Sequence, residues 1–540
     1  MKKSITKQAR RTITTAISPY DILEMLLHDR GIEDLSTYLQ PPHPDSIEEA
    51  LWNTEHDQGS LNSFFELLKK VRESKGTIVI YGDYDADGIT STTILWKAFN
   101  EMGFRVFPYI PNRKTEGYGF SHKGIDHVCE VYSPALVLAV DHGIVAKEHV
   151  SYFREKRIPV VIIDHHQKDP DNYPDNALYL FYSTEYSAAA LSYLAARRIY
   201  AYLRDSGQLT PMQAVLVKKL LSADLLALAA LGLVADVIPL IGGARSVAYH
   251  GLKAFSRISM PGLKTLCAIS GVVRKELRSY EVGYYLAPRL NAFGRIGEAL
   301  DGVRLLCSPN SHMAERFGAM AQDLNKKRQI LVESAMKSIE ETVHESASFI
   351  VALGEEWEEG ILGLIAGKLV SAYGKPAIAL TKGEKGYKAS GRSAPGFAMT
   401  KFLRSLPVSF ASIGGHDGAC GLTISIDEYP RLLETLSQSE IVINPPKVSA
   451  DLDIPFSHIT HSLFEVLQKM APFGAGNPDP LFFSQSTLHA IKSFGKTSQH
   501  LIYSFRDGYN DFLDIIHFNA QASPLRSKNG ESCGVFFYGG

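Results

Sequence analysis

The chain has 540 residues, of which 45% are hydrophobic and 21% charged, and its formal net charge is -2. This length exceeds what one hydrophobic core normally serves, so three or four domains are expected. The balanced charge excludes a general attraction to nucleic acid or to an anionic membrane. A polyanionic partner would therefore need a local basic groove.

The cysteines argue for a reducing environment. They are odd in number, scattered, and never arranged as Cys-x-x-Cys, which disfavours a disulfide framework and a thiolate zinc site: they are Cys129, Cys267, Cys307, Cys420 and Cys533. No stretch approaches the roughly 20 apolar residues that span a bilayer. The basic residues near Met1 are not followed by the apolar core of a signal peptide. We therefore expect a cytoplasmic protein that does not enter a membrane.

The first 60 residues show short helical patterns ended by prolines, which predict a helical preface over residues 1–60. An amphipathic helix then begins at Leu61. Apolar runs follow, separated by helical or loop segments, at residues 77–80, 104–110, 136–140 and 159–163. This alternation is typical of a parallel α/β sheet. We expect this first α/β domain to cover residues 61–305.

The first of these strands ends in an unusually acidic loop, Gly-Asp83-Tyr-Asp85-Ala-Asp87-Gly. Alternate residues of an extended segment point the same way, so three carboxylates would crowd together. They repel one another unless a cation lies between them. An EF-hand is excluded because the twelfth position, counted from Asp83, is Ile94 rather than Glu, and because a strand precedes the loop.

Two more strands end in candidate metal ligands. Asp141-His142-Gly follows residues 136–140, and Asp164-His165-His166 follows residues 159–163. Ligands of open parallel sheets bind beyond the carboxyl ends of the strands, so these groups should converge. Asp236, after an apolar helical stretch, could cap the next element or bind metal, and the other clusters favour metal.

In their order along the chain, these motifs and Val234-Ala-Asp236-Val-Ile-Pro resemble the motifs of the DHH phosphoesterase superfamily. Further motifs resemble those of one family in particular, the RecJ single-stranded-DNA exonucleases. These motifs are Ile110-Pro-Asn-Arg113 with Glu116-Gly-Tyr-Gly, Arg289-Leu-Asn-Ala-Phe-Gly-Arg295, Ser390-Gly-Arg392-Ser393, Gly414-Gly-His416 and Pro472-Phe-Gly-Ala-Gly-Asn-Pro. The resemblance covers about residues 60 to 490.

The resemblance implies a metal centre in which Asp85 and Asp87 each bind one ion beside Asp83. Asp141 would bridge the ions, and His165 and Asp236 would complete the ligand set. His166 and Asp164 would be ligands or supporting groups, while at His142 the family often has a small polar residue, so whether it is a further ligand stays open. Carboxylates with imidazole and no thiolate suit Mn²⁺ or Mg²⁺. Two such ions about 3.5–4 Å apart can activate water for phosphodiester hydrolysis.

The second half of the chain predicts three further parts. A long charged helix within residues 306–345 connects to a second α/β domain of DHHA1 type over residues 346–445, and residues 446–540 resemble an oligonucleotide-binding (OB) barrel that could be incomplete. Gly367-Lys368 is no P-loop, since Leu362 and Leu369 replace its required residues. Residues 390–393 and 414–416 are expected to be glycine-rich loops that grip phosphate.

Carried over by motif, the substrate-binding residues would be Arg113, Arg289, Arg295, Ser390, Arg392, Gly414, Gly415 and His416. Arg295, Ser390 and Arg392 would hold a terminal 5′ phosphate, and His416 would face the scissile phosphate. Together with the metal centre, the resemblance makes Asp85, Asp87, Asp141, His165, His166, Asp236 and His416 the catalytic set. Cys420 replaces a usual alanine, a change expected to affect packing only.

The leading hypothesis is a metal-dependent 5′-to-3′ exonuclease on single-stranded DNA that serves recombination and repair. The resemblance implies single-strand-binding protein and a helicase as partners. One alternative is a phosphodiesterase of short oligonucleotides or cyclic dinucleotides, but the added barrel favours an extended strand. Another is an inactive replication scaffold, which the intact Asp and His residues disfavour.

Overall fold

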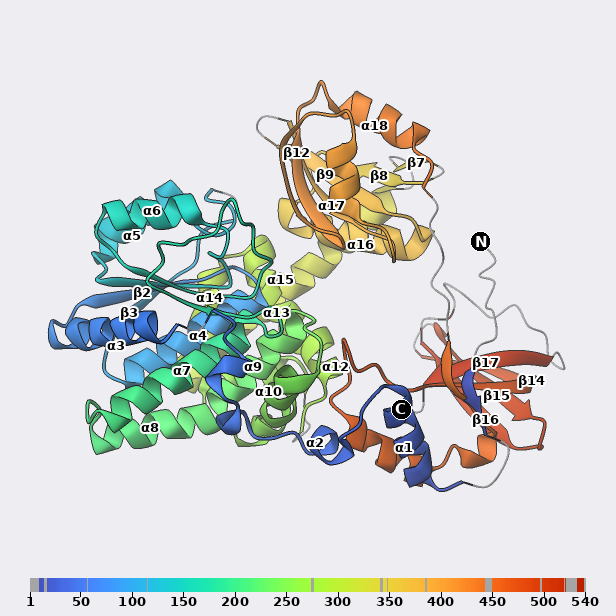
Figure 1. Cartoon of the computed structure of the whole chain (residues 1–540). Helices are drawn as coiled ribbons and strands as arrows, with labels where there is room; N and C mark the ends of the chain where they lie inside the picture. The colour runs from blue at the N-terminus through green and yellow to red at the C-terminus, as the bar shows by residue number, and fades with distance from the viewer. Residues whose placement is uncertain are drawn as a thin grey trace. The chain divides into compact units, whose positions relative to one another are not determined.

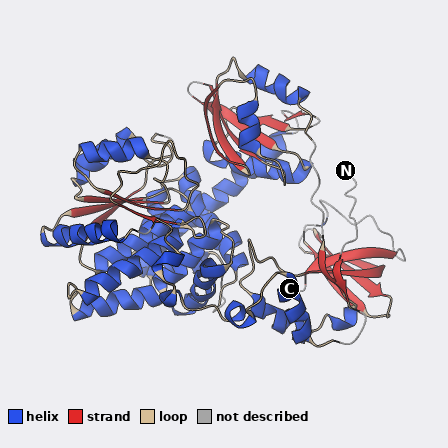
Figure 2. Ribbon diagram, in the orientation of Figure 1, coloured by secondary structure: helices blue, strands red, loops and turns tan. Residues whose placement is uncertain are grey.

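The computed structural model describes residues 9–13, 17–55, 57–113, 115–272, 276–339, 343–346, 348–383, 386–441, 449–495, 498–518, 520 and 532–538. The chain forms two compact units. The large unit comprises residues 43–238 and 242–445, and the small unit comprises residues 1–42, 239–241 and 446–540. Figure 1 traces the chain through both units, and Figure 2 shows that the large one contains both helices and strands.

The large unit begins with a five-stranded parallel sheet, as the sequence predicted. Its strand order is β3 (Arg105–Tyr109), β2 (Thr77–Tyr81), β4 (Leu136–Val140), β5 (Val160–Asp164) and β6 (Tyr179–Tyr182). Strands β2, β4 and β5 are buried along their whole length. Helices cover both faces, which explains why these runs are apolar rather than alternating. The last strand, β6, was not predicted.

One face of this sheet is covered by α5 (His122–Tyr132) and α6 (Lys147–Glu155), whose apolar residues share a core with the sheet. On the other side, α4 (Ala86–Glu101) packs with α7 (Ala188–Asp205) and α9 (Asp224–Ala235). Almost every residue of α9 is buried, so it has no polar face. The remaining helices of this half are α3 (Gln58–Glu73), α8 (Pro211–Ser222), α10 (Gly242–Ala254), α11 (Pro261–Ile269), α12 (Ser279–Glu281), the π turn η4 (Val282–Leu286), α13 (Ala287–Ile296) and α14 (Ala299–Leu306).

The expected connecting helix is α15 (Ser311–Ser338), which lies within the predicted segment of residues 306–345. Asn310 caps its first turn by accepting a hydrogen bond from the Met313 N–H. A six-stranded sheet follows, in the order β11 (Phe410–His416), β12 (Ala419–Ile424), β10 (Gly386–Arg392), β9 (Ala377–Gly383), β8 (Ile350–Leu353) and β7 (Val343–Glu345). Helices η6 (Glu359–Ile361), α16 (Leu362–Tyr373), α17 (Met399–Ser405) and α18 (Tyr429–Gln438) complete this second α/β half.

The prediction that residues 390–393 and 414–416 form loops was wrong for most of them. Ser390 and Arg392 lie in β10, and Gly414 to His416 end β11. The turn is instead Asp417-Gly418, a two-residue hairpin connection between β11 and β12. The glycines of these segments suggested loops. Within a strand, however, a glycine has no side chain, so another group can approach the sheet surface closely.

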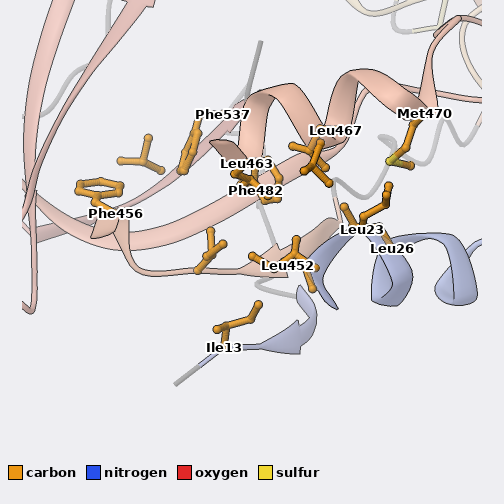
Figure 3. Close-up of a cluster of buried hydrophobic side chains, with 14 of the residues drawn as sticks. Ile13, Leu23, Leu26, Leu452, Phe456, Leu463, Leu467, Met470, Phe482 and Phe537 are labelled. Atoms are coloured by element: carbon orange, nitrogen blue, oxygen red, sulfur yellow. The ribbon is translucent and has the colours of Figure 1, made fainter. Parts of the chain in front are cut away.

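The small unit also differs from its expected boundary. Strand β1 (Ala9–Thr12) pairs in parallel with β13 (Ala450–Asp453), and the sheet continues through β14 (Leu481–Phe494), β15 (His500–Asp507) and β16 (Phe512–His517), with β17 (Ser532–Tyr538) beside β14. Helix α1 (Pro19–Asp29) packs on α19 (His461–Leu467), near α2 (Leu35–Leu39). Figure 3 shows Leu23 and Leu26 facing Leu467 and Met470.

The expected helical preface is therefore not a separate part. Apolar side chains at Ile13 and within residues 17–39 share a hydrophobic core with the C-terminal sheet. The pairing of β1 with β13 joins segments more than 400 residues apart, and no local sequence pattern announces such a contact. Across the described residues, the structure contains no helix both long and apolar enough to cross a membrane.

Candidate active site

The three strand-end motifs meet at one edge of the parallel sheet, together with Asp236 at the carboxyl end of α9. Three overlapping groups of side chains each place their ligand atoms within 4.8 Å of one another. They are Asp83 with Asp85 and Asp141, Asp87 with His165 and Asp236, and Asp141 with His165 and His166. These three groups together contain every carboxylate and imidazole of this domain that the sequence predicted to be catalytic.

Local structure explains how the acidic loop is held. Asp85 caps α4, and its Oδ1 accepts hydrogen bonds from the Asp87 and Gly88 N–H groups at 2.9 and 3.0 Å. The Asp87 carboxylate accepts from the Ala188 and Ala189 N–H groups at the amino end of α7. Asp83 is different, because its Oδ1 is buried without a hydrogen-bond partner among the described residues. A bare buried carboxylate oxygen is costly unless a cation binds it.

Asp141 and His165 lie at the centre of the cluster. The Asp141 backbone is left-handed, with φ of 67°, a conformation that Asp tolerates better than most residues. Tyr118 stabilises it by donating a hydrogen bond from its hydroxyl to the Asp141 carbonyl at 2.9 Å. His165 Nε2 lies 3.2 Å from Asp141 Oδ1, 3.6 Å from Asp236 Oδ2 and 3.8 Å from Asp87 Oδ2. One imidazole nitrogen thus faces three carboxylates.

The electrostatics of the cluster favour a bound cation. Burial, and then repulsion from neighbouring carboxylates, raises the pKa of Asp87 to about 7 and that of Asp236 to about 8. The same causes raise the pKa values of Asp83 and Asp141 well above their usual range. Burial lowers the pKa of His165 to about 4, which keeps its ring neutral and able to bind metal.

Asp164 supports the cluster rather than joining it. Its carboxylate accepts hydrogen bonds from the backbone N–H groups of Ile144, His165 and His166, and its Oδ1 lies 2.8 Å from His166 Nδ1. The imidazoles beside it keep the pKa of Asp164 low despite its burial, which acts in the opposite direction. Of the two roles that the sequence left open for Asp164, orienting the His166 ring is the one that these contacts favour.

His142, the other open question, lies outside the three groups. Its Nε2 is 3.0 Å from the Tyr81 carbonyl oxygen, and its ring packs edge-on against Tyr81 and Phe120. Burial lowers its pKa to about 4. These contacts bury His142 against aromatic residues of the sheet core, and they favour a packing role for it over a ligand role.

A basic pocket adjoins the acidic loop. Tyr84, which stands between Asp83 and Asp85 in the chain, lines a pocket of about 180 Å³ together with Arg113, Arg295 and Gly360. The Arg113 guanidinium carbon lies 4.9 Å from the centre of the Tyr84 ring. Arg295 donates a hydrogen bond to the Gly360 carbonyl, and burial beside the other arginines lowers its pKa to about 10.

The second α/β half supplies the rest of this basic region. The register aligns Ser390, Gly421 and Gly414 in one row and Arg392, Ala419 and His416 in the next, so all six share one face of the sheet. A side chain on Gly414 or Gly421 would meet no atom within 4 Å. Gly415 faces the other way, against Cys420 and Ala419. The bare glycine surface therefore lies between Ser390, Arg392 and His416.

Sequence reasoning missed two features of the basic region. The first is the amino end of α16, which has no side-chain cap. A Cβ at Gly363 would lie 2.6 Å from a terminal nitrogen of the Arg392 side chain, so a larger residue here would displace this guanidinium. The Leu362 N–H already donates to the Glu359 carbonyl of η6, and a helix amino end favours a phosphate through the N–H groups that remain free. The segment Gly360-Ile-Leu-Gly363 contains the two glycines that could have indicated a phosphate-binding helix end, but the same sequence is equally typical of an apolar helix.

The second missed feature is Arg328 on α15. Its Nε is buried without a hydrogen-bond partner among the described residues, and its charge acts on Arg289 and Arg295. Arg289, which the sequence did predict, is engaged within the protein. It donates to Gln322 Oε1 and to the Tyr285 and Ile269 carbonyls. Arg328 is thus the less satisfied of the two.

Comparison with known proteins agrees with this geometry. Residues 77–233 match the DHH family N-terminal domain, residues 346–439 the DHHA1 domain, and residues 450–538 the RecJ OB domain. The single-stranded-DNA-specific exonuclease RecJ of Bacillus subtilis is 31% identical over 474 residues, which are 84% of this chain and 57% of that protein. This chain therefore spans little more than half of that relative's length.

Two solved structures show the same fold. The Mn²⁺ complex of RecJ from Thermus thermophilus matches with a TM-score of 0.77 at 24% identity, covering 98% of this chain and 76% of that one. A manganese-bound exonuclease RecJ matches with a TM-score of 0.59 at 28% identity, covering 70% of this chain and 93% of that one. The predicted order of DHH, DHHA1 and OB domains is confirmed. The chain belongs to the RecJ family of DHH-domain proteins.

Proposed function

We propose that this protein is a 5′-to-3′ exonuclease that hydrolyses single-stranded DNA with two bound divalent cations. One observation carries the proposal. The acidic cluster and the basic pocket share Tyr84, whose chain neighbours are cluster carboxylates and whose side chain lines the pocket. A phosphate gripped by the arginines would place the next phosphodiester beside the carboxylates.

The residues of the cluster fit the cations. Asp83, Asp85, Asp87, Asp141, His165 and Asp236 offer hard oxygen donors and one imidazole, the set that suits Mn²⁺ or Mg²⁺. When bound, the two ions activate water and stabilise charge on the phosphate. Asp141, shared by two of the ligand groups, is the proposed bridge. Asp164 and Tyr118 hold the ligands in place.

Polarity follows from the basic pocket. Arg295, Ser390 and Arg392 would hold the terminal 5′ phosphate, with Arg113, Arg328 and the amino end of α16 nearby. A terminal phosphate carries more charge than an internal diester and can accept a two-pronged Arg contact. His416 shares the sheet face of Arg392 and would contact the scissile phosphate. Arg289 would act by fixing α13 against α15.

A role in recombination and repair, work with single-strand-binding protein and a helicase, and action in a reducing cytoplasm are parts of the same proposal. The RecJ OB domain supports an extended substrate rather than a dinucleotide. The complete acidic cluster disfavours an inactive scaffold.

The test is digestion of single-stranded DNA labelled at one end, with the 5′ and the 3′ end blocked in separate substrates. We expect mononucleotide release with Mn²⁺ or Mg²⁺ when the 5′ end is free, and none with chelator. Release from the 3′ end, or cutting in chelator, would contradict the proposal. Parallel reactions with a dinucleotide and a cyclic dinucleotide test the alternative substrates.

A further inference from the structure

One helical segment extends from the acidic cluster to a group of exposed tyrosines. Within α13, the side chain of Asn291 accepts a hydrogen bond from the Ala86 N–H at 2.8 Å, beside Asp85. Arg295, one turn further, lines the basic pocket. Within α13, the spacing of three and four residues places Pro288, Asn291 and Arg295 on one face, and Tyr284 lies in the π turn that directly precedes this helix.

The two sides of this segment differ in burial. Tyr284 is 69% exposed, and Pro288, Asn291 and Arg295 are partly exposed. The opposite side is apolar and fully buried, through Val282, Leu286, Leu290 and Phe293. Exposed and partly exposed residues therefore occur along this segment from the tyrosines to the basic pocket.

The tyrosines form an aromatic group at the start of this face. Tyr280 and Tyr285 are 56% and 40% exposed. The rings of Tyr280 and Tyr284 are stacked, with centroids 4.6 Å apart and an angle of 30°, and Tyr285 meets Tyr280 edge-on. The backbone here is the π turn η4, a geometry often found at functional sites. The folding of this unit does not explain three large rings left in solvent.

The surroundings indicate which ligand the rings would bind. Arg289 lies next to the group and donates a hydrogen bond to the Tyr285 carbonyl at 2.6 Å. It is also close enough to Arg328 for the two positive charges to repel each other. Further along the face, Pro288 is followed by the polar Asn291 and the basic Arg295. Aromatic rings beside arginines are the means by which proteins bind single-stranded nucleic acid, stacking on bases and pairing with phosphates. A protein-docking patch would be expected to continue in apolar residues.

We propose that Tyr280 and Tyr284 are a stacking platform for nucleobases of the substrate strand, on the 3′ side of the bond that is cut. This inference rests on the proposed function. Seven residues separate Tyr284 from Asn291, which is about 10 Å along the helix. At about 3.4 Å or more per nucleotide, the platform meets bases within roughly three nucleotides of the cluster. Only unpaired bases expose a face to it, so the platform selects single strands.

The test is a double-mutant cycle between protein and DNA. The full chain is titrated, in chelator so that nothing is cut, with a 5′-phosphorylated, 3′-labelled 12-nucleotide oligothymidylate. A second set of strands carries one abasic residue at each of positions one to six. We expect Tyr284→Ala to weaken binding of the intact strand roughly tenfold. An abasic residue at the stacking position should cost the parent the same factor and cost Tyr284→Ala almost nothing more.

Two variants serve as controls. Tyr284→Phe keeps the ring and should bind like the parent. Met212→Ala removes a side chain on α8 that is 67% exposed, and it should change nothing. Binding of the intact strand by Tyr280→Ala and Tyr284→Ala within twofold of the parent would overturn the platform. So would additive losses at every abasic position.

A second measurement, cleavage of the intact strand by the parent with Mn²⁺, tests the proposed exonuclease function separately from the stacking platform. Coupling without cleavage would leave the platform as a strand-binding site and refute the exonuclease. Cleavage without coupling would leave the exonuclease and refute the platform.

Discussion

The acidic cluster and the basic pocket of the large unit are built in opposite ways. The cluster contains five carboxylates, three of which face His165, and burial with mutual repulsion raises the pKa values of four of the five. In the basic region around the pocket, burial beside other cations lowers the pKa values of Arg295, Arg328 and Arg392. The cluster concentrates negative charge, whereas the pocket lining includes Glu298 and Glu359 beside Arg113 and Arg295. In the proposed function, metal ions would complement the first region and phosphate the second, so the first region would carry out the chemistry and the second would recognise the strand end.

The largest expected effect comes from the acidic side. Asp141→Ala should lower the cleavage rate more than about 100-fold, because loss of a bridging ligand should exceed the 10–100-fold typical of supporting groups. The preference for a 5′ phosphate should persist in the residual activity. Asp141→Asn is the matched variant, since Asn also tolerates the left-handed backbone but lacks the charge. Rates and bound metal are measured together, and activity within tenfold of the parent with unchanged metal content would refute the bridge.

The second effect comes from the basic side. Arg392→Ala should reduce the ratio of cleavage rates for 5′-phosphorylated and 5′-hydroxyl strands by about 10–100-fold, since each charge-assisted hydrogen bond contributes about 1.5–3 kcal/mol. Bound metal should stay unchanged. Arg404→Ala, an exposed residue on α17, is the control. An unchanged ratio in Arg392→Ala would show that this pocket does not select the end.

The salt dependence of DNA binding should sharpen the comparison further. Despite the net charge of -2, log Kd should rise linearly with log salt, with a slope of about 0.7 per phosphate contacted. Arg328→Met, which keeps most of the side chain's volume, should reduce that slope by about 0.7, equivalent to a two- to threefold change in Kd over a fourfold salt range. A parent that shows no salt dependence would exclude a basic groove.

The two regions also differ in how far sequence alone could predict them. The acidic cluster is local, because each ligand directly follows a buried strand or helix, and the parallel sheet brings the strand ends together. The basic pocket depends on packing between distant segments. Arg328 is one charged residue among many on a long helix, and Gly363 becomes informative only where α16 meets β10. Likewise, the glycines around Ser390 and Gly414 indicated loops, so the strands there were not predicted. The position of β1 could not be predicted because its partner strand lies at the far end of the chain.

The smallest expected effect concerns the stability of the metal-free protein. In the folded state the pKa of Asp87 is raised to about 7 and that of Asp236 to about 8, from an ordinary value of 3.8. Between those limits the folded state binds more protons than the unfolded state, so stability must fall as pH rises from about 4 to 8. In chelator, hydrogen exchange in residues 77–109 should therefore be faster at pH 8 than at pH 5.5, after correction for intrinsic rates. Mn²⁺ should abolish the difference. Asp83→Asn removes one buried charge and should reduce the difference, whereas Asp427→Asn, at an exposed position, should not. Protection that increases towards pH 8 in chelator would show that the carboxylates do not repel one another as their placement implies.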